Sequence, residues 1–154
     1  MGWWGVGVVN GDGPRDIIDT IEFLCDMVDE EDYEQAKDSF INNRNSFKAV
    51  SHEAKLNAGL ELGDEETVTY QTLAFLYLKW QVTMPAEFKQ QVLEKTKAEI
   101  NDLVITNSEG WKDPDERKAA LEKFTDCVEK DNGGGLEFGM LFWSAELNDR
   151  EFFD

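Results

Sequence analysis

The single histidine of the chain, His52, limits the catalytic chemistry that the sequence could support. It lies in the segment "HEAKL", which lacks the second histidine of the HExxH pattern that binds zinc from one helix face. A serine or cysteine nucleophile would also need His52 as its base, and no local nucleophile signature is present. The sequence therefore predicts an ordinary polar histidine on a short helix. A small enzyme of unknown reaction remains an alternative function.

Two glycine-rich motifs near the start resemble ligand-binding loops but depart from their spacing. In "GVGVVNG" the third glycine of a dinucleotide-binding GxGxxG pattern falls one residue late, at Gly11. In the calcium-loop reading of "NGDGPRD", Pro14 occupies the fifth position, and the twelfth is Ile21 rather than an acidic residue. We therefore expect no cofactor and no metal.

The cysteines and the apolar segments bear on localisation. Cys25 and Cys127 are far apart and show no metal-binding CxxC spacing, which favours two buried, reduced thiols. Residues 1–16 contain only short apolar pieces broken by glycine, unlike a signal peptide. The apolar segment "TLAFLYLKW" is far shorter than the roughly 20 residues that span a membrane. We expect a cytoplasmic protein that does not bind membranes.

Negative charge is concentrated in one part of the chain. The chain has a net charge of −18. The segment from Asp12 to Asp38 contains eleven acidic and two basic residues, so its net charge of −9 is half of the total. Residues 79–130 are nearly neutral, with nine basic and eleven acidic residues. This distribution disfavours direct binding to nucleic acid or to an anionic membrane.

The acidic segment includes a predicted amphipathic helix from Pro14 to Asp29, which follows a Gly-Pro start typical of helix N-termini. Its apolar residues fall within an arc of about 120° and are expected to face the core: Ile17, Ile18, Ile21, Leu24, Cys25 and Val28. Its opposite face carries carboxylates at three-and-four spacing: Asp16, Asp19, Glu22, Asp26 and Asp29. Phe23 projects among them. Either another segment covers that ring, or it is an exposed anchor for a partner.

These features support two functional hypotheses of different classes. The first is a non-enzymatic interaction module that binds a basic protein through this helix, with Phe23 or the pair Trp3 and Trp4 as anchor. The second is a DNA mimic whose carboxylates imitate duplex phosphates and inhibit a nucleic-acid-binding protein. The simpler interpretation is an acidic surface that maintains solubility. The oligomeric state is left open.

The remaining helices are predicted from apolar periodicity and from start and stop signals. The expected ranges are 32–43, with Tyr33, Ala36 and Phe40 inward, then 51–62, 65–82, 85–103 and 114–130. Helix 65–82 is expected to be the most buried, because its apolar surface is broad rather than confined to a stripe. The expected inward residues of the last two helices are Phe88, Val92, Thr96, Ile100 and Leu103, and Ala120, Leu121, Phe124 and Val128.

The two ends of the chain show alternation typical of strands. Residues 3–9 and 136–147 could form a short pair, with Trp3 and Trp4 packed on the helices, while a helix over 139–147 competes for the second segment. The sequence thus predicts a mainly α protein, with a single helical domain (1–154) of five or six helices and, as an option, this short terminal strand pair.

The opening "MGWWGVGVVNGDGPRDIID" resembles a family of small uncharacterised bacterial and phage proteins that begin Met-Gly-x-Trp-Gly. The segment "GWKDPDERKAALEKF" is similar to the tryptophan-led start of the last helix in that family. The resemblance covers about the first 25 residues and this second block. It implies a mostly helical fold and no known activity.

Overall fold

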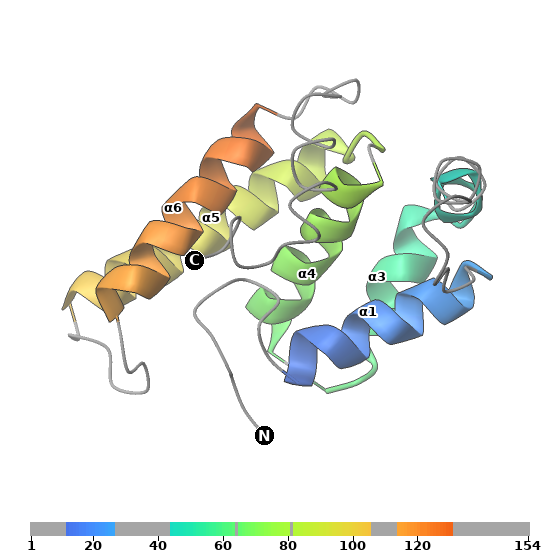
Figure 1. The fold of residues 1–154 in the computed structure, drawn as a ribbon, viewed down its shortest axis with the longest axis horizontal. Coiled ribbons are helices and arrows are strands. Elements are labelled where there is room, and N and C mark those ends of the chain that lie inside the picture. The colour runs from blue at the N-terminus through green and yellow to red at the C-terminus, as the bar shows by residue number, and fades with distance from the viewer. Residues whose placement is uncertain (1–11, 27–43, 64, 81, 106–113, 131–154) are drawn as a thin grey trace, which may run out of the picture.

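The computed structural model describes residues 12–26, 44–63, 65–80, 82–105 and 114–130 (Figure 1). These residues are mainly helical and include no strand, which confirms the predicted fold class. Several predicted features lie outside them: the helix over 32–43, both terminal segments with Trp3 and Trp4, and Asp29.

Helix α4 (Glu66–Lys79) occupies the centre of the described structure (Figure 1). On one side it packs against α1 (Asp12–Leu24) and α3 (His52–Leu60), and on the other side against α5 (Ala86–Ile105). Helix α6 (Pro114–Glu129) packs along α5. Because α4 has neighbours on both sides, it connects the two halves of the core.

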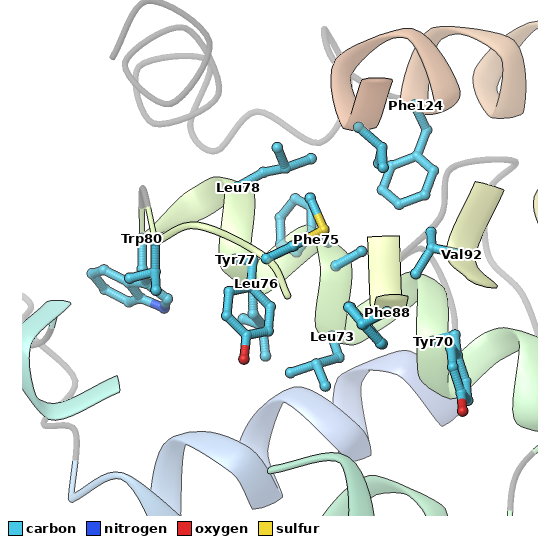
Figure 2. Close-up of a cluster of buried hydrophobic side chains, with 14 of the residues drawn as sticks. Tyr70, Leu73, Phe75, Leu76, Tyr77, Leu78, Trp80, Phe88, Val92 and Phe124 are labelled. Atoms are coloured by element: carbon cyan, nitrogen blue, oxygen red, sulfur yellow. The ribbon is translucent and has the colours of Figure 1, made fainter. Parts of the chain in front are cut away.

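The central position of α4 explains its unusual burial. All residues from Thr69 to Leu78 are buried, so the helix has no solvent-facing stripe over that stretch. Figure 2 shows Phe124 reaching from α6 toward the cluster that α4 and α5 form. The prediction that this helix is the most buried element is confirmed for the described residues.

The helices α5 and α6 also bury the faces that periodicity predicts. Phe88, Val92, Thr96 and Leu103 of α5 are buried, and Ile100 is half-buried against the core. In α6 the buried set includes Ala120, Leu121, Phe124 and Val128. The bounds differ from the prediction by one or two residues, within the usual variation at helix ends.

Helix α1 ends five residues earlier than predicted. It stops at Leu24 rather than Asp29, because Asp26 adopts a φ of 55°, in the left-handed region that ends a helix. Leu24, predicted to be in the core, is 41% exposed. It lies at the edge of the apolar arc and in the last helical position. The other described members of that arc are buried as predicted: Ile17, Ile18, Ile21 and Cys25.

The starts of α3 and α4 differ in how they are capped. Ser51 caps α3, since its side-chain oxygen accepts a hydrogen bond from the backbone N–H of Ala54 at 3.2 Å. Glu65 holds the cap position of α4 and makes no side-chain capping bond. Asp64, the residue before it, lies outside the described residues.

Two departures from the prediction lie beside these helices. Residues 44–49 are helical, which periodicity did not predict, and Phe47 within them is fully buried. Helix α4 ends at Lys79 instead of Val82. The Val82 N–H donates to the carbonyl of Tyr77 at 3.0 Å, five residues earlier in the chain. An α-helix pairs residues four apart, so the regular α-helical hydrogen bonding has ended at this point.

A buried ion pair joins the elements of the second half. The Arg117 side chain is 1% exposed, and its Nε and Nη2 both donate to Oε2 of Glu99 at 3.0 Å. Gln71 of α4 donates to Oε1 of Glu99 at 3.0 Å and to the hydroxyl of Thr96 at 3.2 Å. The Glu99 carboxylate therefore connects α4, α5 and α6.

Gly59 permits the close approach of α3 to its two neighbours. A Cβ at this position would lie 2.8 Å from Cγ2 of Thr69 and 3.4 Å from Cγ2 of Ile17. Thr69 is fully buried and its hydroxyl donates to the Glu65 carbonyl at 3.3 Å, so its side chain has little freedom to move away. The absence of a side chain at Gly59 is thus a packing requirement.

We expect Gly59→Ala to lower the free energy of unfolding by about 1–2 kcal/mol, because overpacking outweighs the gain of about 1 kcal/mol in helix propensity. Urea denaturation followed by circular dichroism measures the change. Asn57→Ala, at an exposed position of the same helix, is the control and should stay within about 0.5 kcal/mol of the wild type. A Gly59→Ala protein as stable as the control would show that α3 can shift.

Candidate functional site

The outer face of α1 is exposed and includes an apolar ring. Asp16 and Asp19 are exposed, Glu22 is half-buried, and Phe23 is 84% exposed. At about 100° per residue, Phe23 falls between Asp16 and Asp19 in projection along the helix. No segment that the structure describes covers this ring, which favours the exposed alternative.

The early end of α1 changes the extent of the predicted acidic surface. Asp26 is exposed but lies in the turn after the helix, and Asp29 is outside the described residues. Arg15 is also exposed on α1, so the surface is not uniformly acidic. A helix of 13 residues is about 20 Å long at 1.5 Å per residue. We use the name α1 acidic face for Asp16, Asp19, Glu22, Phe23 and Asp26.

A second surface, which the sequence analysis missed, is a pocket of about 320 Å³ beside the start of α3. The described residues that line it include four nitrogen-bearing basic side chains and no acidic one. We call it the cationic pocket. Its lining residues are Arg44, Lys48, Val50, Ser51, His52, Lys55, Tyr77, Val82, Thr83 and Pro85.

Lys55 is the most unusual residue of the cationic pocket, because it is only 2% exposed. Its Nζ donates to the Phe47 carbonyl at 2.9 Å and lies 3.7 Å from the centre of the Phe47 ring. The Tyr77 ring centre is 4.6 Å away. None of the described carboxylates forms an ion pair with it. Burial lowers the pKa of Lys55 from 10.5 to about 8.

His52 is held by aromatic neighbours from two other elements. Its Nδ1 lies 2.9 Å from the Tyr77 hydroxyl, and its ring meets Phe88 edge-on with centroids 4.6 Å apart. Burial, assisted by the charge of Lys55, lowers the pKa of His52, so the imidazole is neutral at neutral pH. Burial raises the pKa of Tyr77, so its hydroxyl stays protonated. This neutral pair fixes the position of both rings.

The two thiols are buried and free, as predicted. Burial raises the pKa of Cys25 to about 11, although the charge of Lys55 opposes this, and it raises the pKa of Cys127 to about 11 as well. The thiolate is the reactive form of cysteine, and neither residue supplies it at neutral pH. The described residues around Lys55 therefore fit a ligand-binding site better than a catalytic site with a cysteine nucleophile.

A signal for the cationic pocket was present in the sequence. Residues 44–55 include Arg44, Lys48, His52 and Lys55 against one acidic residue, Glu53, in a chain where acidic residues outnumber basic ones 33 to 15. His52 and Lys55 are three residues apart, which places them on one side of a helix. The helical conformation of residues 44–49 was not predicted, so Arg44 and Lys48 were not related to His52 and Lys55.

Comparison with known protein families, curated proteins and solved structures finds no match to this chain. The similarity of its opening to the Met-Gly-x-Trp-Gly family stays a prediction. Among the described helices, none combines the length and apolar character needed to cross a membrane. Within the same residues, no three His, Cys, Asp or Glu side chains gather so that they could hold a metal ion.

Proposed function

We propose that this protein is a non-enzymatic interaction module that binds a basic protein through the α1 acidic face. The observation that supports this is the 84% exposure of Phe23 between the exposed carboxylates of Asp16 and Asp19. A phenylalanine side chain gains roughly 2–3 kcal/mol when it is buried, and here that free energy is not used in folding. A partner that covers the ring would gain it on binding.

The charges and the ring have separate roles in this proposal. Carboxylates on an exposed surface attract a basic partner over a distance and mainly increase the association rate. An aromatic anchor that enters a pocket is desolvated in the complex and mainly slows dissociation. The partner that fits this face has a positively charged surface with an apolar pocket large enough for a phenyl ring.

The alternative functions are less consistent with these contacts. A DNA mimic presents negative charge alone, whereas Phe23 has no counterpart along a phosphate backbone, and α1 is only about 20 Å long. An enzyme that used Cys25 as its nucleophile would start from a buried thiol whose raised pKa keeps it protonated, and the Nδ1 atom of His52 is already within hydrogen-bond distance of the Tyr77 hydroxyl. Cytoplasmic localisation and the single-domain organisation of residues 1–154 stay predictions.

We expect Phe23→Ala to raise the dissociation rate of the partner about 10–100-fold, the equivalent of about 1.4–2.8 kcal/mol of lost anchoring. Asp16→Lys and Asp19→Lys should instead slow association, and this effect should fade at high salt. All three positions are exposed, so each variant should keep its stability within about 0.5 kcal/mol. Surface plasmon resonance with the captured partner separates the two rates.

Affinity capture with matched bait proteins identifies the partner and also tests whether it binds the α1 acidic face. Leu62→Ala is the control bait, because Leu62 is also an exposed apolar residue, at 43%, but lies after α3. A prey that wild type and Leu62→Ala retain, and that Phe23→Ala and high salt release, supports the proposal. A prey that both alanine variants release equally would contradict it. A prey that binds DNA in competition with this protein would favour the DNA mimic.

A further inference from the structure

We infer that the cationic pocket binds a small organic anion that carries a phosphate group. This site lies at the start of α3, between residues 44–51 and the end of α4, and does not include the α1 acidic face. It is therefore a binding site independent of the proposed partner surface.

The sign of the charge in this pocket is opposite to that of the chain. With His52 neutral, Lys48 and Lys55 each contribute a positive charge beside the guanidinium of Arg44, and none of the described lining residues is acidic. The chain as a whole has a net charge of −18. A local excess of cations in such a chain provides electrostatic attraction for an anion where the rest of the surface repels it.

The burial of Lys55 favours an anionic ligand. Buried charges in proteins are normally paired, because removing an ion from water is costly. Lys55 is 2% exposed, its Nζ donates to the neutral carbonyl of Phe47, and two aromatic rings flank its ammonium group. An ammonium group has three donors, so two more hydrogen bonds can go to a ligand. An anion in the pocket would provide a counter-charge, which none of the described carboxylates gives to Lys55 as an ion pair.

The size and the lining of the pocket define the ligand class. A volume of about 320 Å³ lies at the lower end of the range of about 300–1,000 Å³ for small-molecule sites, which suits a compact metabolite. The ammonium groups of Lys48 and Lys55 match the two negative charges of a phosphate dianion better than the single charge of a carboxylate. The hydroxyls of Ser51 and Thr83 can donate to the same group, and Ser51 caps the positive end of α3. The apolar remainder of the lining suits a short carbon skeleton: Val50, Val82 and Pro85.

The test is a titration of the full-length protein with glycerol 3-phosphate and with inorganic phosphate, at constant ionic strength in a buffer without multivalent anions. Isothermal titration calorimetry should show one saturable site for both, and thermal unfolding should shift upward with ligand concentration. Glycerol and acetate are the control ligands and should do neither. Saturable binding of acetate with equal affinity would overturn the phosphate assignment.

Matched lysine variants locate the site. Lys55→Met should weaken binding of glycerol 3-phosphate at least tenfold, and Lys48→Met, at an exposed position that folding tolerates, should weaken it severalfold. Lys95→Met is the control, because Lys95 also lies near an aromatic ring, 4.9 Å from Tyr70, but pairs with Glu66 outside the pocket. Phe23→Ala should leave this affinity unchanged. No saturable binding by the wild type, or equal losses in the Lys48, Lys55 and Lys95 variants, would overturn the inference.

Discussion

Replacing Glu99 with leucine is expected to destabilise the protein by about 3–5 kcal/mol, because it removes the carboxylate that pairs with a buried guanidinium. Arg117 is 1% exposed, and Glu99 accepts both of the hydrogen bonds recorded for its Nε and Nη2. The same change also removes an acceptor from Gln71, whose own carbonyl oxygen is already buried without a partner. Urea denaturation followed by circular dichroism measures the loss.

The reverse substitution, Arg117→Met, should cost less than Glu99→Leu. The Glu99 side chain is 22% exposed, so water can solvate its carboxylate once the guanidinium is gone, whereas Arg117 has no such access. The double variant should recover part of the loss, since an apolar pair can replace a buried ion pair with little change in stability. A Glu99→Leu protein within about 1 kcal/mol of the wild type, or a costlier Arg117→Met, would contradict this account.

A change in stability with pH is the second large effect that we expect, and it comes from Lys55. Burial lowers the pKa of this lysine from 10.5 to about 8 in the folded protein. Between these values the folded state has released the proton while the unfolded state still holds it, so stability rises with pH. The full contribution is about 3 kcal/mol at 1.36 kcal/mol per pKa unit. Below pH 8 the buried charge is present in full and opposes folding.

Other buried groups titrate in the same range with the opposite sign. Burial raises the pKa of Cys25 and of Cys127 from 9.0 to about 11, so the unfolded chain loses these protons first and stability falls above pH 9. Tyr77, whose pKa is also raised, acts in the same direction at higher pH. The described groups that face Lys55 are Cys25 in the turn after α1, Tyr77 of α4, the Phe47 carbonyl and the neutral His52.

A comparison with Lys55→Met isolates the lysine. We expect the variant to be more stable than the wild type at pH 7, and the difference to shrink by about 3 kcal/mol as the pH rises to 10.5. Chemical denaturation at pH 7, 8.5 and 10 measures it. A difference that does not change with pH would show that the rings of Phe47 and Tyr77 offset the cost of burying the charge.

Local signals in the sequence predicted most of the helical framework. Pro14 and Pro114 lie in the first turns of α1 and α6. The apolar residues at three-and-four spacing that include Val92 in α5 and Phe124 in α6 identify the buried faces of these two helices. These predictions succeed because helix starts and amphipathic periodicity depend on residues within a few positions of one another. The broad burial of α4 was also predictable, since its apolar residues cover a broad surface rather than a single stripe.

The ends of helices, and helices without a clear start signal or apolar repeat, were harder to predict. The left-handed residue that ends α1 is Asp26, where the usual glycine signal is absent. The helical turns over 44–49 have no strong apolar repeat, and their main contribution to the core is Phe47. Tertiary packing overrides weak local propensity in such segments.

The sequence by itself determined the helical class of this protein, the faces of its helices and the surplus of acidic residues on the outer side of α1. Only the tertiary structure decided that Phe23 is uncovered and that Lys55 is buried beside His52 and Tyr77. Periodicity assigns a side chain to a face but contains no information on which other element covers that face. The contacts of the cationic pocket join residues 25 positions apart, which only the packing of α3 on α4 brings together.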